Sequence, residues 1–356
     1  MSKKFTNGYA LLIAVDQNSV AQWALPDVVK DVNALRDVLI HPDRCAYNLK
    51  HVRVITGNKA TRQGILEGLK WLSAQLVADK SGNATVVVYY TGHGWRDPNS
   101  NPSTFYFIPF EVEATAIKLS ALRASDFADE IAALQPKRLF VALDCCHAAG
   151  ADVKDLTPIG NAVSAAIPVQ TFMPISADVA VLADSTGDKA LSDLAVGAGR
   201  AVLSSSQSVE KSWVRKDGSM SVFTYYMIEA LTGHAQPAGG ATEVLVSDVM
   251  SHVYRNVPKL VQSERGQDQH PDYQVSGNFP VALLLGGKGL DVGQAAPDPL
   301  QFPKPSERAI KITVGDGAVA VGDNSTVAGA GGMAIGGNVS GSVSVGAAKP
   351  RSTKPR

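Results

Sequence analysis

Short apolar runs alternate with amphipathic segments along the first 145 residues, and this alternation limits the fold more than any other feature. Apolar runs without polar alternation are typical of strands that are buried on both faces of a sheet. Between them, apolar residues recur at helical spacing. The expected strands are 9–15, 51–56, 84–90 and 138–143, and the expected helices are 26–41, 61–78 (with Thr61 as N-cap) and 124–134. The pattern predicts an α/β domain with a mostly parallel sheet covered by helices on both faces.

The chain after residue 145 divides into an irregular stretch and a second set of regular signals. Residues 150–195 are rich in Ala, Asp, Ser and Pro without periodicity, and a connection of this length is typically functional. We then expect strands at 200–205 and 279–285 and helices at 222–231 and 247–257. Pro258 is expected to end the last helix, because proline cannot donate the backbone hydrogen bond that a helix interior needs.

Composition changes again near residue 286, which predicts that the first domain covers residues 1–286. Polar, proline-bearing residues 287–306 are typical of a linker, and the basic residues 350–356 of a terminal tail. Between them, residues 307–349 repeat an apolar-small-apolar-Gly unit, as in Val319-Ala320-Val321-Gly322. A small β-roll, a strand-adding assembly segment and a disordered segment all fit this glycine-rich repeat.

Charge and cysteine content limit the partners and the cellular location that we expect for the protein. Lys+Arg and Asp+Glu are equal at 33 each, which gives no electrostatic reason to expect nucleic acid or an anionic membrane as partner. We find no signal peptide and no apolar run long enough to span a bilayer. Of three cysteines, Cys145 and Cys146 are adjacent and poorly placed to pair, while Cys45 is read as incidental. A reducing, cytoplasmic location is therefore expected.

Chemically reactive residues follow two of the expected strands. One strand leads into Thr91-Gly92-His93-Gly94, and another into Asp144-Cys145-Cys146-His147. The carboxyl ends of parallel strands meet at one edge of a sheet, so an imidazole and a thiol are expected in one cleft. An imidazole can take the proton of a thiol and later protonate a leaving amine.

These two motifs resemble the catalytic His and Cys motifs of caspase-like cysteine peptidases, particularly the bacterial and metacaspase branch. Cys146 follows His93 by 53 residues, which suits the known spacing of about 50. The similarity extends over residues 9–285 and includes the segment 222–226. It implies a caspase-like three-layer sandwich and a cysteine endopeptidase acting on protein or peptide substrates. In this assignment Cys146 is the nucleophile, His93 is the base, and the N–H groups of Gly94 and Cys146 bind the oxyanion.

The resemblance also implies a substrate pocket. Asp144 matches an acidic pocket residue two positions before the nucleophile, Asp31 matches a second one in the first helix, and Thr91 matches a polar pocket residue. Two carboxylates favour an Arg or Lys side chain before the scissile bond. Two positions depart from the family pattern, because Lys30 stands where Asn is usual and Ala148 where Ser is usual.

The resemblance bears on two further properties, calcium binding and self-cleavage. Many metacaspases have an acidic calcium cluster, but here the acidic residues are scattered, so no metal or other cofactor is expected, and activation by calcium is the alternative that stays open. Those residues are Asp97, Glu111, Glu113, Asp152 and Asp155. Self-cleavage within residues 150–200 is a hypothesis that rests on Lys154, Lys189 and Arg200.

Several alternatives stay open at this point. A caspase-like endopeptidase cutting after Asp is one, although no arginine replaces Asp144. A non-catalytic scaffold that assembles or binds an activator through the repeat is another, although His93 and Cys146 are intact. Asp144 could cap a turn, Asp31 could be a solvated helix residue, and Cys145 is the alternative nucleophile.

Overall fold

The computed structural model describes residues 7–42, 44–97, 100, 104–145, 191, 193–207, 210–235, 243–284, 319–321 and 333–335. The chain divides into two units, residues 1–303 and 304–356, and each is described by itself. Cys146, His147 and nearly all of the irregular stretch 150–195 lie outside the described residues.

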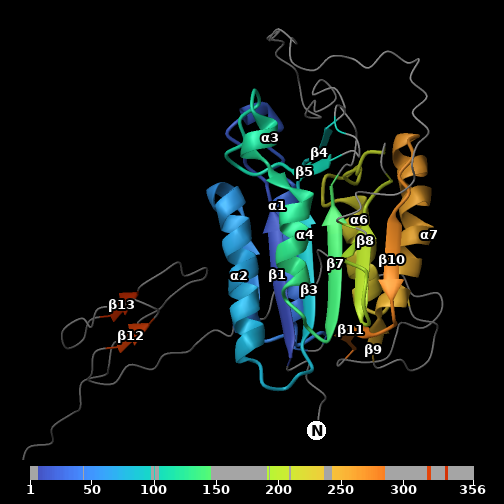
Figure 1. Cartoon of the computed structure of the whole chain (residues 1–356). Coiled ribbons are helices and arrows are strands. Elements are labelled where there is room, and N and C mark those ends of the chain that lie inside the picture. Colours follow the sequence, from blue (N-terminus) through green and yellow to red (C-terminus); the bar gives the residue numbers. More distant parts are fainter. Residues whose placement is uncertain are drawn as a thin grey trace, which may run out of the picture. The chain divides into compact units, whose positions relative to one another are not determined.

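A six-stranded sheet forms the centre of the first unit, in the order β10-β8-β7-β3-β1-β2 (Figure 1). Its strands are β1 (Gly8–Ala14), β2 (Val52–Ile55), β3 (Thr85–Thr91), β7 (Arg138–Asp144), β8 (Arg200–Ser204) and β10 (Asp272–Ser276). The first five are parallel, and β10 pairs antiparallel with β8. The predicted mostly parallel sheet is confirmed.

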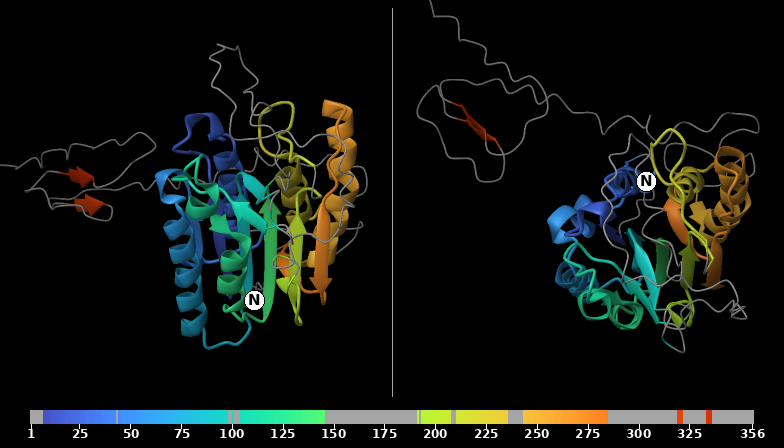
Figure 2. Two further views of the ribbon diagram at one scale, coloured as in Figure 1. Left: turned by 45° about the horizontal axis from the view of Figure 1, so that its top comes forward. Right: turned by 90° about the horizontal axis from the view of Figure 1, so that it is seen from above.

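Helices cover both faces of this sheet, as the two turned views show (Figure 2). On one face lie α1 (Val28–Ile40), α6 (Val222–Leu231) and α7 (Val246–Arg265). On the other face lie α2 (Arg62–Ala78) and α4 (Ala124–Ala132). Alternate residues of β1 serve the two layers, because Leu12 belongs to the apolar cluster on the first face and Leu11 to the cluster on the second. The three-layer arrangement explains why the inner strands β1, β3 and β7 are apolar over most of their length.

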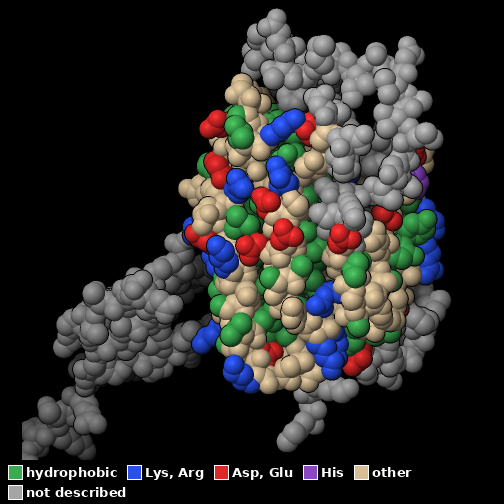
Figure 3. Space-filling model, in the orientation of Figure 1, with side chains coloured by type: hydrophobic (Ala, Val, Ile, Leu, Met, Phe, Trp, Pro, Cys, Tyr) green, Lys and Arg blue, Asp and Glu red, His purple; other side chains and the backbone are tan. Residues whose placement is uncertain are grey.

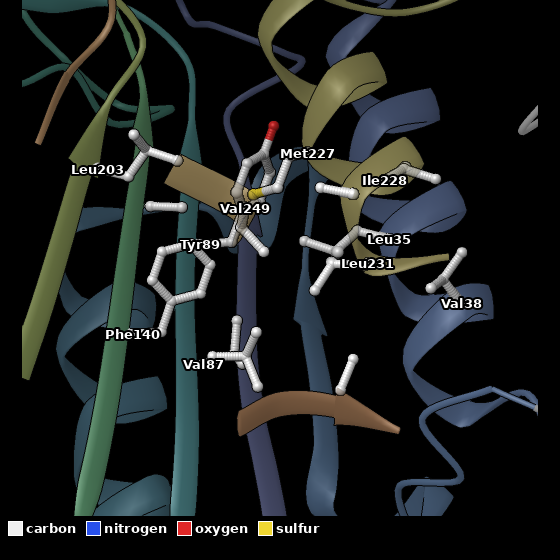
Figure 4. Close-up of a cluster of buried hydrophobic side chains, with 14 of the residues drawn as sticks. Leu35, Val38, Val87, Tyr89, Phe140, Leu203, Met227, Ile228, Leu231 and Val249 are labelled. Carbon is white, nitrogen blue, oxygen red and sulfur yellow. The ribbon is translucent and has the colours of Figure 1, made fainter. Parts of the chain in front are cut away.

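The first cluster joins segments from both halves of the domain (Figure 4). Phe140 and Leu203 extend from β7 and β8, and they meet Met227 and Leu231 of α6 and Leu35 of α1. Burying an aliphatic or aromatic side chain of this size contributes about 1.5–3 kcal/mol, so the cluster fixes α1 and α6 against the sheet.

Short elements extend the fold at the carboxyl ends of the strands. The antiparallel strands β4 (Gly94–Asp97), β5 (Thr104–Phe107) and β6 (Leu122–Arg123) form a small sheet. With α3 (Ile117–Ser120) and the 3-10 helix η1 (Ala21–Trp23) they share an apolar cluster that includes Trp23 and Tyr106. The other two 3-10 helices described are η2 (Leu49–His51) and η3 (Gly57–Lys59). β4 and β6 carry no apolar run, whereas β5 contains the start of the apolar run 105–110; none of the three strands was expected from the sequence.

One expectation about the end of the domain is wrong, namely that Pro258 ends the last helix. α7 continues past Pro258 to Arg265, because Val253, Val257 and Val261 stay buried at helical spacing. That burial outweighs the roughly 3 kcal/mol cost of an interior proline. The strand expected at 279–285 is confirmed as β11 (Pro280–Leu283), which pairs with β9 (Glu243–Leu245) in a separate two-stranded sheet.

In the second unit, β12 (Val319–Val321) and β13 (Met333–Ile335) pair in parallel. They coincide with two of the predicted repeat units. The rest of residues 307–349, the linker 287–306 and the tail 350–356 lie outside the described residues. Assembly through the repeat therefore stays a prediction.

The surface and the helices add two observations. On the face shown in Figure 3, basic and acidic side chains are interspersed over α2 and α4, in keeping with equal numbers of the two kinds. Within the described ranges, no helix combines the length and the apolar character that crossing a bilayer requires.

Candidate active site

The ends of β3 and β7 place the two sequence motifs side by side. Thr91, the last residue of β3, is paired with Asp144, the last residue of β7. The Gly92 N–H donates to the Asp144 carbonyl oxygen at 3.3 Å, which holds the two strand ends together. His93 comes two residues after Thr91, between β3 and β4, and Cys146 comes two residues after Asp144 in the sequence. Cys146 itself lies outside the described residues.

His93 is half-buried and held by the chain around it. Its Nε2 lies 3.0 Å from the carbonyl oxygen of Trp23. A carbonyl oxygen only accepts, so Nε2 carries the proton and Nδ1 keeps its lone pair. The His93 carbonyl oxygen accepts from the Ile108 N–H at 3.1 Å and from the Tyr90 hydroxyl at 3.0 Å. Burial lowers the pKa of His93 to about 4, so the imidazole is neutral near pH 7.

Gly94 begins β4, opposite Phe107 of β5. Hydrogen-bonded and non-hydrogen-bonded residue pairs alternate along an antiparallel ladder. The Ile108 N–H donates to His93, so the next pair, Gly94 and Phe107, is a non-hydrogen-bonded one. The N–H of Gly94 therefore points away from β5 and is available as a donor beside His93.

Asp31 of α1 and Asp144 of β7 lie together beneath the strand ends, although 113 positions separate them in the sequence. They are 1% and 4% exposed. The Ser221 N–H donates to Asp31 Oδ1 at 2.9 Å, while the Ser221 hydroxyl donates to Asp144 Oδ2. Asp31 is therefore not a solvated helix residue, and one serine joins the two carboxylates.

Further hydroxyl groups surround Asp144. It accepts from Ser212 Oγ at 2.6 Å and from Thr224 Oγ1 at 3.1 Å. The Tyr89 hydroxyl lies 2.6 Å from Thr224 Oγ1, and a side-chain hydrogen bond joins Tyr89 to Thr91. Figure 4 shows the Tyr89 ring among the apolar side chains of the core. Thr91 is thereby connected to the acidic pair through Tyr89 and Thr224, and its pocket role stays a prediction.

Both carboxyl groups are harder to ionise than in water. Burial raises the pKa of Asp31 well above its usual range, and the charge of Asp144 adds to this rise. Burial also raises the pKa of Asp144, but the hydroxyls of Ser212, Ser221 and Thr224 oppose the rise. The arrangement is a buried acidic site, which suits a cationic guest.

Several of these contributors could not be predicted from the sequence. Ser221 carries a local signal, because its side chain caps α6 by accepting from the Thr224 N–H at 2.9 Å. No local signal indicates that the same serine bridges two distant carboxylates. The Trp23 carbonyl has no side-chain signature at all, and Ser212 lies in an irregular segment.

Cys145, the alternative nucleophile, is 1% exposed and belongs to the apolar cluster on the α2–α4 face. Its neighbours there include Tyr90 and Leu143. A thiol in such surroundings is a packing residue rather than a reactive one.

The acidic residues considered for calcium do not form a cluster in the described part of the chain. Asp97 is paired with Lys118 at 2.6 Å, and the Glu111 carboxylate accepts from the Arg62 N–H at 2.9 Å. No group of three potential metal ligands occurs among the described residues, and Asp152 and Asp155 lie outside them.

Of the three basic residues considered for self-cleavage, Arg200 alone is described. It begins β8, where it is paired with Leu139 of β7 and Ser276 of β10. Its guanidinium donates to the Pro136 carbonyl oxygen at 2.8 Å. Cleavage after Arg200 would require a central strand to leave the sheet, so the structure argues against this residue as a cleavage point.

Solved structures similar to this chain include caspase-1 from Spodoptera frugiperda, with 12% identity, a TM-score of 0.41, and coverage of 83% of this chain and 94% of that one. A protein from Geobacter sulfurreducens shows 14% identity, a TM-score of 0.44, and coverage of 76% and 94%. The Drosophila initiator caspase Dronc shows 11% identity, a TM-score of 0.41, and coverage of 80% and 85%.

Comparison with curated proteins finds no match. The model of the caspase domain family, in contrast, matches residues 7–280, well over half of the chain. The predicted caspase-like fold is confirmed, and the chain belongs to the caspase domain family of cysteine peptidases.

Proposed function

We propose that this protein is a cysteine endopeptidase that cleaves peptide bonds after Arg or Lys, with Cys146 as nucleophile and His93 as base. The observation that carries the specificity is the buried pair Asp31 and Asp144, joined by Ser221. A guanidinium or ammonium group between two carboxylates gains charge-assisted hydrogen bonds. An Asp side chain in the same place would bring a further negative charge next to the acidic pair, which disfavours the alternative specificity.

Catalysis begins with a proton transfer. The Trp23 carbonyl fixes the proton of His93 on Nε2, which leaves Nδ1 to accept the proton of the Cys146 thiol. The sulfur attacks the carbonyl carbon of the scissile bond, and the N–H groups of Gly94 and Cys146 bind the oxygen of the tetrahedral intermediate. The imidazolium then protonates the leaving amine. Water, deprotonated by His93, releases the acyl group from the sulfur.

A peptide panel tests this proposal. Full-length protein is assayed on fluorogenic peptides with Arg, Lys, Asp or citrulline before the scissile bond, with calcium or with a chelator. We expect kcat/KM for Arg and Lys to exceed that for Asp by about 100-fold or more, since a missing or reversed buried charge costs several kcal/mol.

Two cysteine variants serve as a matched pair in this assay. Cys146→Ala should remove activity, whereas Cys145→Ala should keep it and lower thermal stability because it leaves a small cavity. Cleavage only after Asp would overturn the specificity. Equal loss in both variants, with both proteins folded by circular dichroism, would contradict the assignment of the nucleophile.

A further inference from the structure

The two carboxyl groups of the acidic pair, Asp31 and Asp144, are both hydrogen-bonded to the same serine. Asp31 and Asp144 belong to elements far apart in the sequence, yet both bind Ser221, one through its N–H and one through its hydroxyl. Both carboxyl groups are almost fully buried. Two carboxylates in such a place do not both ionise readily, because like charges in a poorly solvated site repel strongly.

Hydrogen bonding favours charge on one member of the pair. Asp144 accepts from the hydroxyls of Ser212, Ser221 and Thr224. Asp31 accepts from the Ser221 N–H. Donors that point at a carboxylate stabilise its ionised form, so Asp144 takes the charge and Asp31 takes the proton.

Other charged and titratable groups around the pair do not change which of the two carboxyl groups is ionised. From α1, Asp27 adds negative charge and Lys30 adds positive charge. The Lys30 ammonium is half-exposed and engaged with Asp27 Oδ1 at 2.7 Å and the Gly218 carbonyl at 2.9 Å. From β3, Tyr89 faces the pair, and burial raises its pKa well above the usual range, so it stays a neutral phenol. Among the described residues, no Lys or Arg forms an ion pair with Asp31 or Asp144.

We propose that Asp31, Asp144 and Ser221 act as one unit that holds a single proton in the unliganded protein and releases it when an Arg or Lys side chain binds. This inference rests on the proposed specificity. The step balances: the Asp31 carboxylic acid loses its proton to solvent, and the guanidinium or ammonium ion then lies between two carboxylates. Ser221 is a positioning residue, because it fixes both carboxyl groups from one point at the start of α6.

Proton release makes affinity for basic side chains depend on pH. Below the pH at which the unit loses its proton, the Kd of an Arg peptide should rise up to tenfold per pH unit, because each bound ligand displaces one proton. Above that pH, affinity should be constant and no proton should be released. A citrulline peptide has the shape of the Arg peptide without its charge, so its Kd should vary little over the same range.

Isothermal titration calorimetry tests the inference directly. Full-length Cys146→Ala protein is titrated with the Arg peptide and with its citrulline counterpart, at several pH values between 5 and 8. Each titration is run in two buffers that differ in ionisation enthalpy and have pKa values near the working pH, such as acetate and MES in the acidic half of the range and phosphate and Tris in the alkaline half. The buffer dependence of the binding enthalpy gives the number of protons released, and we expect it to approach one for the Arg peptide at the acidic end. In the double variant with Asp31→Asn, the number of protons released should fall to zero and the Arg peptide should bind more weakly.

The outcomes separate this inference from the proposed function. Tight Arg binding with no proton released at any pH would overturn the single-proton unit and leave the specificity intact. Equal affinity for Arg and citrulline peptides would overturn the specificity and the unit with it. Proton release that persists in Asp31→Asn would overturn the assignment of the proton to Asp31.

Ser221 has its own test. Ser221→Ala removes the hydroxyl donor to Asp144 and keeps the N–H donor to Asp31. The pH at which Arg affinity begins to fall should shift upward by roughly 0.5–1 unit, as expected for one lost hydrogen bond to a carboxylate. Ser221→Thr keeps a hydroxyl and should restore the original profile. Loss of the α6 cap alone would lower the melting temperature without moving this pH, and that result would contradict the positioning role.

Discussion

His93→Ala should lower kcat/KM for an Arg peptide by about 1,000-fold, since a positioned general base contributes roughly 100- to 10,000-fold. The imidazole is neutral near pH 7, so in the free enzyme it is already in the form that accepts a proton. Its removal leaves the Cys146 thiol without a base. Steady-state kinetics on the Arg peptide measures the effect. Rates are normalised to the mass of protein, and circular dichroism checks that the variant is folded.

A second histidine provides the control for this result. His51 precedes β2 at the opposite end of the sheet, where its ring stacks on Tyr9 at 4.4 Å. His51→Ala should keep kcat/KM within about threefold. A His93→Ala protein that is folded and retains a comparable rate would show that another group serves as base.

Asp144→Asn should lower kcat/KM for Arg peptides by roughly 100-fold, mainly through KM. Asparagine keeps an oxygen that accepts from the surrounding hydroxyls, so the fold is preserved while one buried charge is lost. Losing one partner of a buried, hydrogen-bonded charge pair costs about 2–5 kcal/mol, which corresponds to 30-fold or more in affinity. The KM of a citrulline peptide should change far less.

Asp27→Asn is the matched control for Asp144→Asn. Asp27 precedes α1, four positions before Asp31, but it is exposed and paired with Lys30. Exposed ion pairs of this kind contribute little, so KM should stay within about twofold. If Asp144→Asn leaves the KM of Arg peptides unchanged, its carboxylate belongs to the structural core and not to the substrate pocket.

The central sheet could be predicted from the sequence because its strands are buried on both faces. Residues 9–15 and 84–90 are continuous apolar runs of strand length without polar alternation, which is typical of strands buried on both faces. Thr61 was correctly identified as an N-cap, and its side chain accepts from the Gly64 N–H at 2.8 Å. The edge strand β10 escaped notice because one edge and much of its surface are open, with Tyr273 and Val275 exposed. An exposed strand needs no apolar run.

Some residues of the candidate site could also be predicted from local sequence patterns, whereas the positions of others depend on contacts between distant segments. His93 and Asp144 follow strong strand signals, and parallel strands bring their carboxyl ends together. Asp31 came from family resemblance alone, and its closeness to Asp144 depends on how α1 packs beside α6. The Trp23 carbonyl and the Ser221 bridge depend on loop positions that no local pattern specifies. Cys146 stays a prediction, because it lies outside the described residues.

The neighbouring positions of β7 and β8 have a consequence for any break in the backbone between them. These strands are joined by a ladder from Leu139–Arg200 to Leu143–Ser204, although residues 145–199 separate them along the chain. A nick after Lys154 or Lys189 would leave both strands in the sheet, and Leu35 of one fragment would still pack with the α6 residues of the other.

We therefore expect a nicked protein to give two bands on a denaturing gel and one particle of unchanged mass in native light scattering. Separation of the fragments under native conditions would contradict this. Connectivity of the backbone and integrity of the domain are thus separate properties here. Proteolysis between β7 and β8 can change the chain next to Cys146 while the scaffold that holds His93 and the acidic pair remains assembled.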